Sequence, residues 1–339
     1  MRFSIRINND LPVAQTIRLA QAAEAAGFDQ FWVSNDLFLR SAPTLLAALA
    51  THTERIELGS CIFNPYTINP AELAMLAATM DELSGNRFNL GLAAGAADFL
   101  GWVGLAHDRP VQALRETILA IRRLLRGERV RFEGHFLQWT DEAYLRFPAP
   151  RVTPIYVGAM GPAMLRLTGE LADGALPLLF PPEHYETVRP LIAAGEAKRP
   201  AELGELDLAA CIWVSLAADH AAAREVLAEK IAYYGPSLSP LILERLGLTQ
   251  VDFGPIEQAM QQDGNTNRAL TLVTDQMLQI GVVGDPAALL PRLQGLAAAG
   301  AKHLSFGPPL GPDPVAAIAL LGEQVLPAFR GYPSSPLEA

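Results

Sequence analysis

The sequence has few of the residues from which disulfide-bonded, zinc-binding or nucleic-acid-binding proteins are built. Its 339 residues include only two cysteines, Cys61 and Cys211, which lie far apart and form no CxxC motif. This spacing predicts neither a disulfide framework nor a zinc site, and we expect no other metal. Only 18% of the residues are charged, and the formal net charge of −10 argues against a nucleic-acid-binding surface.

Long apolar runs and targeting signals are also missing. No segment approaches the ~18 apolar residues that a membrane-spanning helix needs. Met1 leads directly into an alternating segment, without the apolar core of a signal peptide. We therefore expect a soluble, cytoplasmic protein that does not bind membranes. Half of the residues are hydrophobic, which is enough for a large core and argues against disorder.

What is present is an alternation of strand and helix patterns from end to end. This order is typical of a parallel sheet covered by helices. Eight strand segments favour a (β/α)8 TIM barrel over an open doubly wound sheet, which usually has fewer strands. The predicted strands are residues 3–7, 30–34, 56–63, 88–93, 155–159, 175–180, 208–216 and 303–307.

Two segments extend this minimal barrel. Residues 131–138 alternate around Gly134 and predict a small hairpin before the fifth strand. Residues 234–285, approximately, are too long for one loop and contain helical patterns, so we predict a helical insertion between strands seven and eight. The whole chain, residues 1–339, is then a single barrel domain.

The most informative segment covers residues 154–180. A predicted apolar strand ends there in a short turn that consists of Gly158, Ala159, Met160 and Gly161. Pro162 follows at a position that suits the first residue of a helix. A glycine turn before a helix leaves backbone N–H groups free at the positive end of the helix dipole, where a phosphate binds well. The pattern predicts a phosphorylated cofactor without identifying it.

In such a barrel, function concentrates at the carboxyl ends of the strands. These ends lack paired His and Cys or Ser, an HExxH motif and a Walker A loop. Their Gly- and Ala-rich sequences fit a site in which a cofactor supplies the chemistry. Structural interpretations compete: Asn35 and Asp36 could cap the following segment, and Cys61 fits a small buried hydrophobe better than a nucleophile. Arg6 needs an anionic partner if its side chain points into the barrel.

Four segments resemble the luciferase-like superfamily. The sequences CIFNPYTINP at 61–70 and MDELSGNR at 80–87 are similar to its third-strand segment. GAMGPAML at 158–165 and LADG at 171–174 resemble the fifth-strand segment of coenzyme F420-dependent methylenetetrahydromethanopterin reductases. Further matches extend toward the C-terminus, so the resemblance covers nearly the whole chain.

The resemblance implies a barrel with F420, or less often FMN, across its mouth. It also implies a non-prolyl cis peptide bond at the end of the third strand, here Cys61–Ile62, that supports the cofactor ring. Helices rich in Ala and Leu, together with the resemblance, predict a homodimer or higher homo-oligomer. The expected cofactor contacts are Ser60, Cys61, Ile62, Asn64, Gly95, Ala96, Gly158, Ala159, Met160, Gly161, Thr274 and Gln276.

Departures from the family pattern concern the reacting groups. The reductases have a glutamate where this chain has Arg6, Asp-His where it has Asn35 and Asp36, and a carboxylate near Ala96. We expect hydride transfer between the deazaflavin C5 and a changed small organic substrate, a class that includes pterins. Asn35 would hydrogen-bond the ring or substrate, and Arg6 or Asp36 would be the electrostatic or proton-handling group. Two alternatives stay open: an FMN-dependent monooxygenase of this superfamily, and a non-catalytic flavin- or deazaflavin-binding protein.

Overall fold

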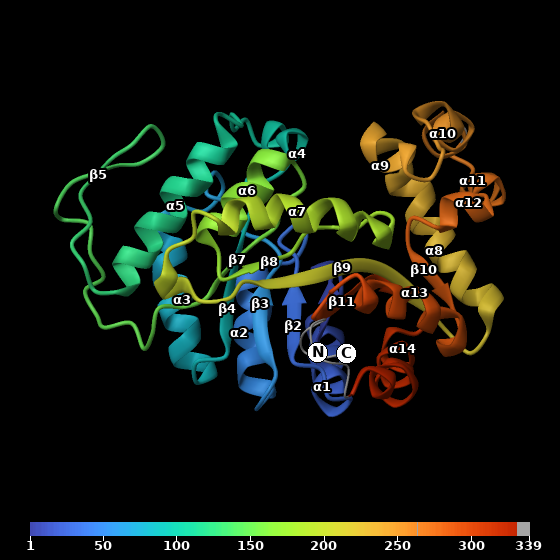
Figure 1. Cartoon of the computed structure of the whole chain (residues 1–339), viewed down its shortest axis with the longest axis horizontal. Coiled ribbons are helices and arrows are strands. Elements are labelled where there is room, and N and C mark those ends of the chain that lie inside the picture. Colours follow the sequence, from blue (N-terminus) through green and yellow to red (C-terminus); the bar gives the residue numbers. More distant parts are fainter. Residues whose placement is uncertain (263, 331–339) are drawn as a thin grey trace.

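Eight parallel strands close into a barrel in the computed structural model, which describes residues 1–262 and 264–330 (Figure 1). The pairing of the last strand with the first, and of β8 with β9, completes the ring. The predicted (β/α)8 fold is therefore confirmed. In barrel order the strands are β1 (Arg2–Ile7), β2 (Gln30–Val33), β3 (Glu57–Ser60), β4 (Phe88–Leu92), β7 (Ile155–Val157), β8 (Gly174–Ala175), β9 (Asp207–Leu216) and β11 (His303–Leu310).

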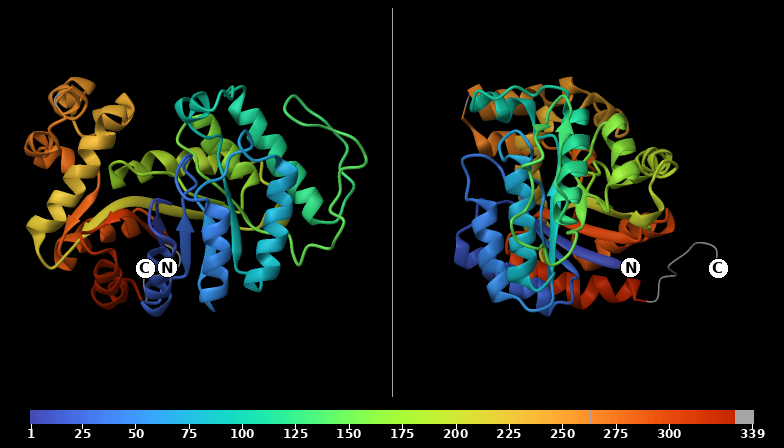
Figure 2. Two further views of the ribbon diagram at one scale, coloured as in Figure 1. Left: turned by 180° about the vertical axis from the view of Figure 1, so that it is seen from behind. Right: turned by 90° about the vertical axis from the view of Figure 1, so that its left-hand side faces the viewer.

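Helices alternate with these strands and cover the outside of the barrel (Figure 2). The covering helices are α1 (Val13–Ala25), α2 (Ala42–His52), α3 (Pro70–Ser84), α5 (Pro110–Leu125), α6 (Pro162–Leu171), α7 (Tyr185–Glu196), α8 (His220–Tyr234), α13 (Pro286–Ala298) and α14 (Pro314–Leu320).

Local sequence signals set the limits of these helices, as α3 illustrates. The Asn69 side chain accepts a hydrogen bond from the N–H of Ala71 at 2.9 Å, and Pro70 occupies the first helical position, where no N–H is needed. Gly85 ends the helix with φ 67°, in the left-handed region that glycine adopts without strain. The face that carries Leu73 is buried, and the helix packs against β4, α2 and α5.

The strands are buried on both faces, as in other parallel sheets that helices cover. On the outer face, Ile5 and Phe31 are fully buried in the large hydrophobic core shared with the helices. The inner face is packed more tightly around aromatic and polar groups: the Trp32 and Tyr156 rings are 4.9 Å apart, and Ser305 is fully buried. The interior is therefore filled rather than open, and polar side chains form part of it.

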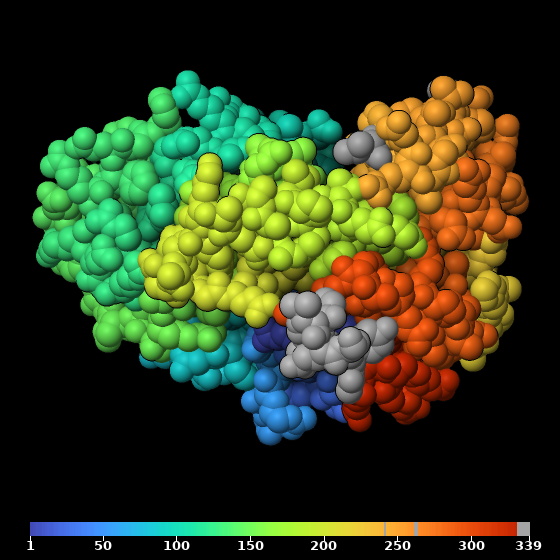
Figure 3. All heavy atoms as spheres, viewed as in Figure 1, coloured from blue at the N-terminus to red at the C-terminus, as the bar shows by residue number. Residues whose placement is uncertain are grey.

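The two predicted additions to the barrel are both present. Strands β5 (Phe132–Glu133) and β6 (Gln138–Trp139) pair antiparallel in the expected hairpin. Between β9 and β11, helices form a lobe that flanks the carboxyl end of the barrel, at the top in Figure 1 and orange in Figure 3. After α8 this lobe contains α9 (Pro240–Glu244), α10 (Gln250–Glu257), α11 (Thr266–Leu272) and α12 (Asp275–Leu278).

Two α-helices and one strand were not predicted, and five barrel strands end before their predicted last residue, β3 and β8 by the most. The missed elements are α4 (Ala97–Trp102), α13 and β10 (Val282–Gly284), a short strand that pairs with β9. Regular pairing ends at Ser60 in β3 and at Ala175 in β8. Isolated bridges continue both edges, from Phe63 to Leu92 and from Leu178 to Cys211. These strand ends leave the regular ladder where the barrel opens toward the candidate site.

Candidate active site

The predicted cofactor-supporting segment lies at the carboxyl ends of β3, β4 and β7. The peptide bond between Cys61 and Ile62 is cis, as the family resemblance predicted. Just before it, the Ser60 hydroxyl donates to the carbonyl of Gly91 at 3.0 Å and accepts from the Gly91 N–H at 2.9 Å. This reciprocal pair fixes the end of β3 against β4.

Two glycines allow the neighbouring segments to approach this bond. A Cβ added to Gly158 would lie 3.1 Å from Cγ2 of Ile62, and one added to Gly95 would lie 3.3 Å from the Asn64 side chain. Gly95 also has φ 76°, which disfavours any larger residue. The structure thus brings Ser60, Cys61, Ile62, Asn64, Gly95 and Gly158 together, as the sequence suggested.

The first turn of α6 is open to an anion. Gly161 occupies the cap position and Pro162 the first helical position, and no side chain caps the turn. The free backbone N–H groups therefore point out of the positive end of the helix dipole. Ala159 is buried, whereas Met160 is 44% exposed beside this turn.

Three predicted cofactor residues lie in other surroundings. Ala96 is exposed and precedes α4. In the insertion, the Thr274 hydroxyl accepts from the N–H of Met277 at 3.2 Å, and the Gln276 amide donates to the carbonyl of Leu246. Both insertion side chains are exposed, and no hydrogen bond joins either one to the strand ends among the described residues.

Arg6 points into the barrel and is 6% exposed. Its Nε donates to the Ser305 hydroxyl at 3.1 Å, and its Nη2 donates to the carbonyl of Ile212 at 2.8 Å. A Cβ at Gly307 would lie 2.3 Å from Nη2, so the glycine makes room for the guanidinium. Among the described residues, no carboxylate lies within 4.0 Å of Arg6.

Asn35 and Asp36 follow β2 at the same edge. The Asp36 carboxylate accepts from the Ser34 hydroxyl at 3.2 Å. Burial raises the pKa of Asp36, while the Ser34 hydrogen bond and Lys230 act in the opposite direction. The half-buried Asn35 has no side-chain hydrogen bond to the described residues. The alternative that this pair caps the next helix is wrong, because Ser41 occupies the cap position of α2.

Sequence reasoning missed a lysine at this edge. Lys230 in α8 places its ammonium 4.8 Å from the ring of Trp213 and 4.7 Å from that of Tyr234. Burial lowers the pKa of Lys230 to about 8, and the charge of Arg6 acts in the same direction. A single lysine in an Ala-rich helix looks like an exposed residue, so no sequence signal distinguished it.

The two cysteines behave as buried hydrophobes rather than nucleophiles. Burial raises the pKa of the Cys61 thiol to about 12 and also raises that of Cys211. Both therefore remain neutral thiols near neutral pH.

The described part of the chain has neither a metal-binding cluster nor a membrane-spanning helix. Across residues 1–262 and 264–330, no group of three or more His, Cys, Asp or Glu side chains is placed to hold a metal ion. Nor does this part of the chain contain a helix with the length and hydrophobicity needed to cross a lipid bilayer.

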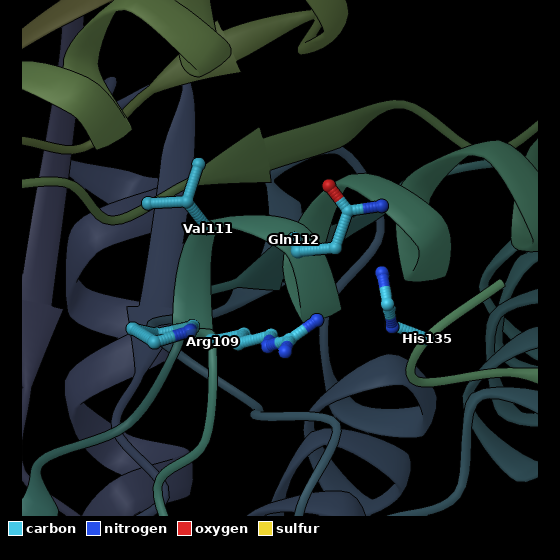
Figure 4. A pocket seen from close by; sticks show the side chains of 5 residues that line it. Arg109, Val111, Gln112 and His135 are labelled. Carbon is cyan, nitrogen blue, oxygen red and sulfur yellow. The ribbon is translucent and has the colours of Figure 1, made fainter.

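A surface cavity of about 640 Å³ lies elsewhere, at the start of α5 and beside the hairpin (Figure 4). Arg109, Gln112 and His135 contribute its polar lining. None of the predicted site residues lines it, so its size does not make it part of the candidate site.

The fold is that of a (β/α)8-barrel enzyme, and its candidate site consists of glycines, backbone amides and a few charged side chains at the strand ends. The chain belongs to the luciferase-like monooxygenase family, whose model matches residues 1–303. It is thus an oxidoreductase, as its relatives are.

Comparisons with individual proteins agree with this assignment. The chain is 31% identical to the 5,10-methylenetetrahydromethanopterin reductase of Archaeoglobus fulgidus, over 97% of this chain and 100% of the relative. It is also 31% identical to the F420-dependent glucose-6-phosphate dehydrogenase of Nakamurella multipartita, over 92% and 91% of the two chains. The structure of the coenzyme F420-dependent tetrahydromethanopterin reductase from Methanopyrus kandleri matches with a TM-score of 0.89 at 29% identity, covering 97% of this chain and 99% of that one.

Proposed function

We propose that this protein is an F420-dependent oxidoreductase that transfers a hydride between the deazaflavin C5 and a small organic substrate. The observation that carries the proposal is the close approach of Gly158 to Ile62 and of Gly95 to Asn64 at the carboxyl ends of the strands, next to the uncapped first turn of α6. Two relatives from different activity classes, the Methanopyrus reductase and the Nakamurella dehydrogenase, are both named as F420-dependent, which supports F420 as the cofactor.

The strand-end residues fit such a cofactor. The Cys61–Ile62 segment would support the ring, and Ser60, Asn64, Gly95 and Gly158 would surround it. Backbone N–H groups of Ala159, Met160, Gly161 and the first turn of α6 would hold the phosphate-bearing tail. Ala96, Thr274 and Gln276 remain predicted contacts. When bound, F420 supplies a ring that carries a hydride, so the protein needs no nucleophile.

The protein's own side chains then orient the substrate and handle a proton. Asp36 has a raised pKa and therefore keeps a proton at higher pH than an ordinary carboxyl. Arg6 is held by Ser305 and Ile212, so its guanidinium presents a fixed positive charge to the site. The amide of Asn35 has no hydrogen-bond partner among the described residues and can hydrogen-bond the ring or the substrate.

The substrate class is the finer part of the proposal. A pterin-type substrate fits the name of the Archaeoglobus relative, but the changed polar residues at Arg6, Asn35 and Asp36 favour a different substrate. A homodimer through the region of α2 and α3 is a further prediction. Met75 and Leu83 on α3 are 50% and 44% exposed and would be buried by such a contact.

A parallel titration with F420 and FMN tests the cofactor. We expect tight binding of F420 and weak binding of FMN, followed through the fluorescence of each cofactor. The reverse preference would assign the protein to the flavin-dependent monooxygenases of the family. Failure of both cofactors to bind would reject the proposed function.

A further inference from the structure

The carboxyl end of the barrel contains an arginine without an anionic partner. Arg6 is almost fully buried, and its hydrogen bonds go to a hydroxyl and to carbonyl oxygens only. Its Nη1 atom donates no hydrogen bond to the described residues. Buried charges in proteins are usually paired, because removing them from water is costly. The missing anion is therefore expected from a ligand.

A second cation at the same edge is in a similar state. The ammonium of Lys230 lies between two rings, those of Trp213 and Tyr234, which attract it without occupying its N–H groups. The charge of Lys230 acts to lower the pKa of Asp36, and the charges of Asp10 and Asp36 act to raise the pKa of Lys230. Neither carboxylate lies within 4.0 Å of the ammonium. Lys230 makes no hydrogen bond to the described residues. It keeps three donors free.

These two cations lie at the same part of β9: Nη2 of Arg6 donates to the carbonyl of Ile212 at 2.8 Å, and the ring of the next residue, Trp213, lies 4.8 Å from the ammonium of Lys230. The positive charge of Arg6 is among the causes that lower the pKa of Lys230, after burial. Burial raises the pKa of Cys61, and the charge of Arg6 opposes that shift. Both of these pKa effects agree with a common location of the two cations at the carboxyl end of the barrel.

We propose that Arg6 and Lys230 together bind an oxyanion of the substrate, either a carboxylate or a phosphate. The rings of Trp213 and Tyr234 form an apolar wall for the carbon skeleton of that substrate. Phe180 extends this wall, because its ring lies 4.2 Å from that of Trp213. The assignment of the ligand as substrate rests on the proposed function; the anion site itself does not. The substrate class is thus a small, negatively charged organic molecule with an apolar or planar part.

Calorimetric titrations with benzoate, phenyl phosphate and the neutral analogue benzamide test this site. We expect at least one of the two anions to bind about tenfold or more tightly than benzamide, a difference typical of a charge-assisted contact. Whichever anion binds more tightly identifies the oxyanion. Equal affinities for both anions and benzamide would overturn the proposal.

Substitutions locate the site. Lys230→Met should remove most of the preference for the anion, and Lys230→Gln should do the same if Met perturbs the fold. Lys302→Met is the matched control, because Lys302 is paired with Glu205 at 2.8 Å at the start of β11. Unchanged anion affinity in both Lys230 variants would contradict the proposal.

A titration of the same samples with F420 separates the two proposals. Anion preference without F420 binding would reject the proposed function and keep the anion site. F420 binding without anion preference would reject the anion site and keep the cofactor assignment. We expect both Lys230 variants to bind F420 with affinity close to that of the wild type, because Lys230 lies on α8 and its ammonium faces the rings of Trp213 and Tyr234, which are not predicted cofactor contacts.

Discussion

The two ends of the barrel interior use charged side chains in opposite ways. At the amino end, Arg2 donates to Asp207 and to Glu57, each at 3.0 Å. Tyr156 donates to Asp207 at 2.8 Å, and His303 contacts the same carboxylate at 3.1 Å. Burial alone would raise the pKa of Asp207, but His303 and Arg2 hold it far below its ordinary value.

At the carboxyl end the charges are left without such partners. Arg6 and Lys230 have no carboxylate within 4.0 Å among the described residues, and burial raises the pKa of Asp36. A hydrogen-bonded chain connects the two ends: His303 contacts the Ser4 hydroxyl at 2.8 Å, and both Ser4 and Arg6 donate to Ser305.

This difference separates stability from function within one barrel. Polar groups that hydrogen-bond one another stabilise the fold and leave no free donor or acceptor for a ligand. Polar groups held in place without partners cost stability but are ready to bind. The amino end fits the first description and the carboxyl end the second, so we expect changes at the amino end to act mainly on stability and changes at the carboxyl end mainly on function.

The largest expected effect is on turnover. If Asp36 handles the proton, Asp36→Asn should lower kcat by about 100-fold or more, because general acid–base groups contribute on that scale. F420 affinity should change little, since Asp36 is not among the predicted cofactor contacts. Steady-state kinetics and cofactor fluorescence measure the two quantities, and unchanged kcat would remove Asp36 from the reaction.

A change at the amino end should act on stability instead. Asp207→Asn removes the charge that Arg2 and His303 contact, which should lower the free energy of unfolding by about 2–3 kcal/mol. Urea denaturation measures the loss, and F420 affinity at low denaturant should be unchanged. Glu205→Gln is the control: Glu205 forms an exposed pair with Lys302, so its loss should cost at most about 0.5 kcal/mol. Similar losses in both variants would contradict the account.

The glycine opposite the cis bond offers a smaller test. Gly158→Ala places a methyl group 3.1 Å from Ile62 and should weaken F420 binding by about tenfold. Gly295→Ala in α13 is the matched control, since a Cβ there meets nothing within 4 Å. Equal F420 affinity in the two variants would show that the ring does not bind beside Gly158 and Ile62.

The smallest expected effect is a pH dependence that Lys230 introduces. Its pKa in the folded protein is about 8, below the ordinary 10.5, so folding disfavours its charged form. The cost to stability is present below pH 8 and is relieved as pH rises from about 8 toward 10.5. Wild type should therefore gain stability relative to Lys230→Met over this window, while its affinity for the anion falls.

Thermal melting at a series of pH values measures that difference. The groups that face Lys230 and bear on its charge are Arg6, Asp10, Asp36 and Tyr234. Burial raises the pKa of Asp36 and that of Tyr234, and both groups are present in wild type and in Lys230→Met alike. A constant difference between wild type and Lys230→Met from pH 7 to pH 10 would contradict the assigned pKa.

The sequence predicted the barrel well because strand alternation, proline at helix starts and glycine at helix ends are local signals. It also placed the cis bond at Cys61–Ile62 through the family resemblance. It missed β10, because three residues ending in a glycine show no clear period. It placed the end of the insertion at residue 285, after that strand.

The orientation and neighbours of the charged residues in the site were harder to predict from the sequence. Alternation in β1 could not decide whether Arg6 points inward, and its surroundings are formed by residues of β9 and β11, far along the chain. Lys230 reaches the site only because α8 packs beside β9, a tertiary contact without a local signature. Thr274 and Gln276 were chosen by resemblance, and their side chains have local hydrogen bonds within the insertion.

One pair of variants tests the difference between the two ends most directly. Arg2→Met and Arg6→Met remove the same group from opposite ends of β1. We predict that Arg2→Met lowers the free energy of unfolding and keeps turnover per folded molecule. We predict that Arg6→Met keeps or raises the free energy of unfolding, because an unpaired buried charge is lost, and abolishes most of the turnover. If Arg6→Met destabilises the protein more than Arg2→Met does, or retains full turnover, the carboxyl-end charges are structural and the account is wrong.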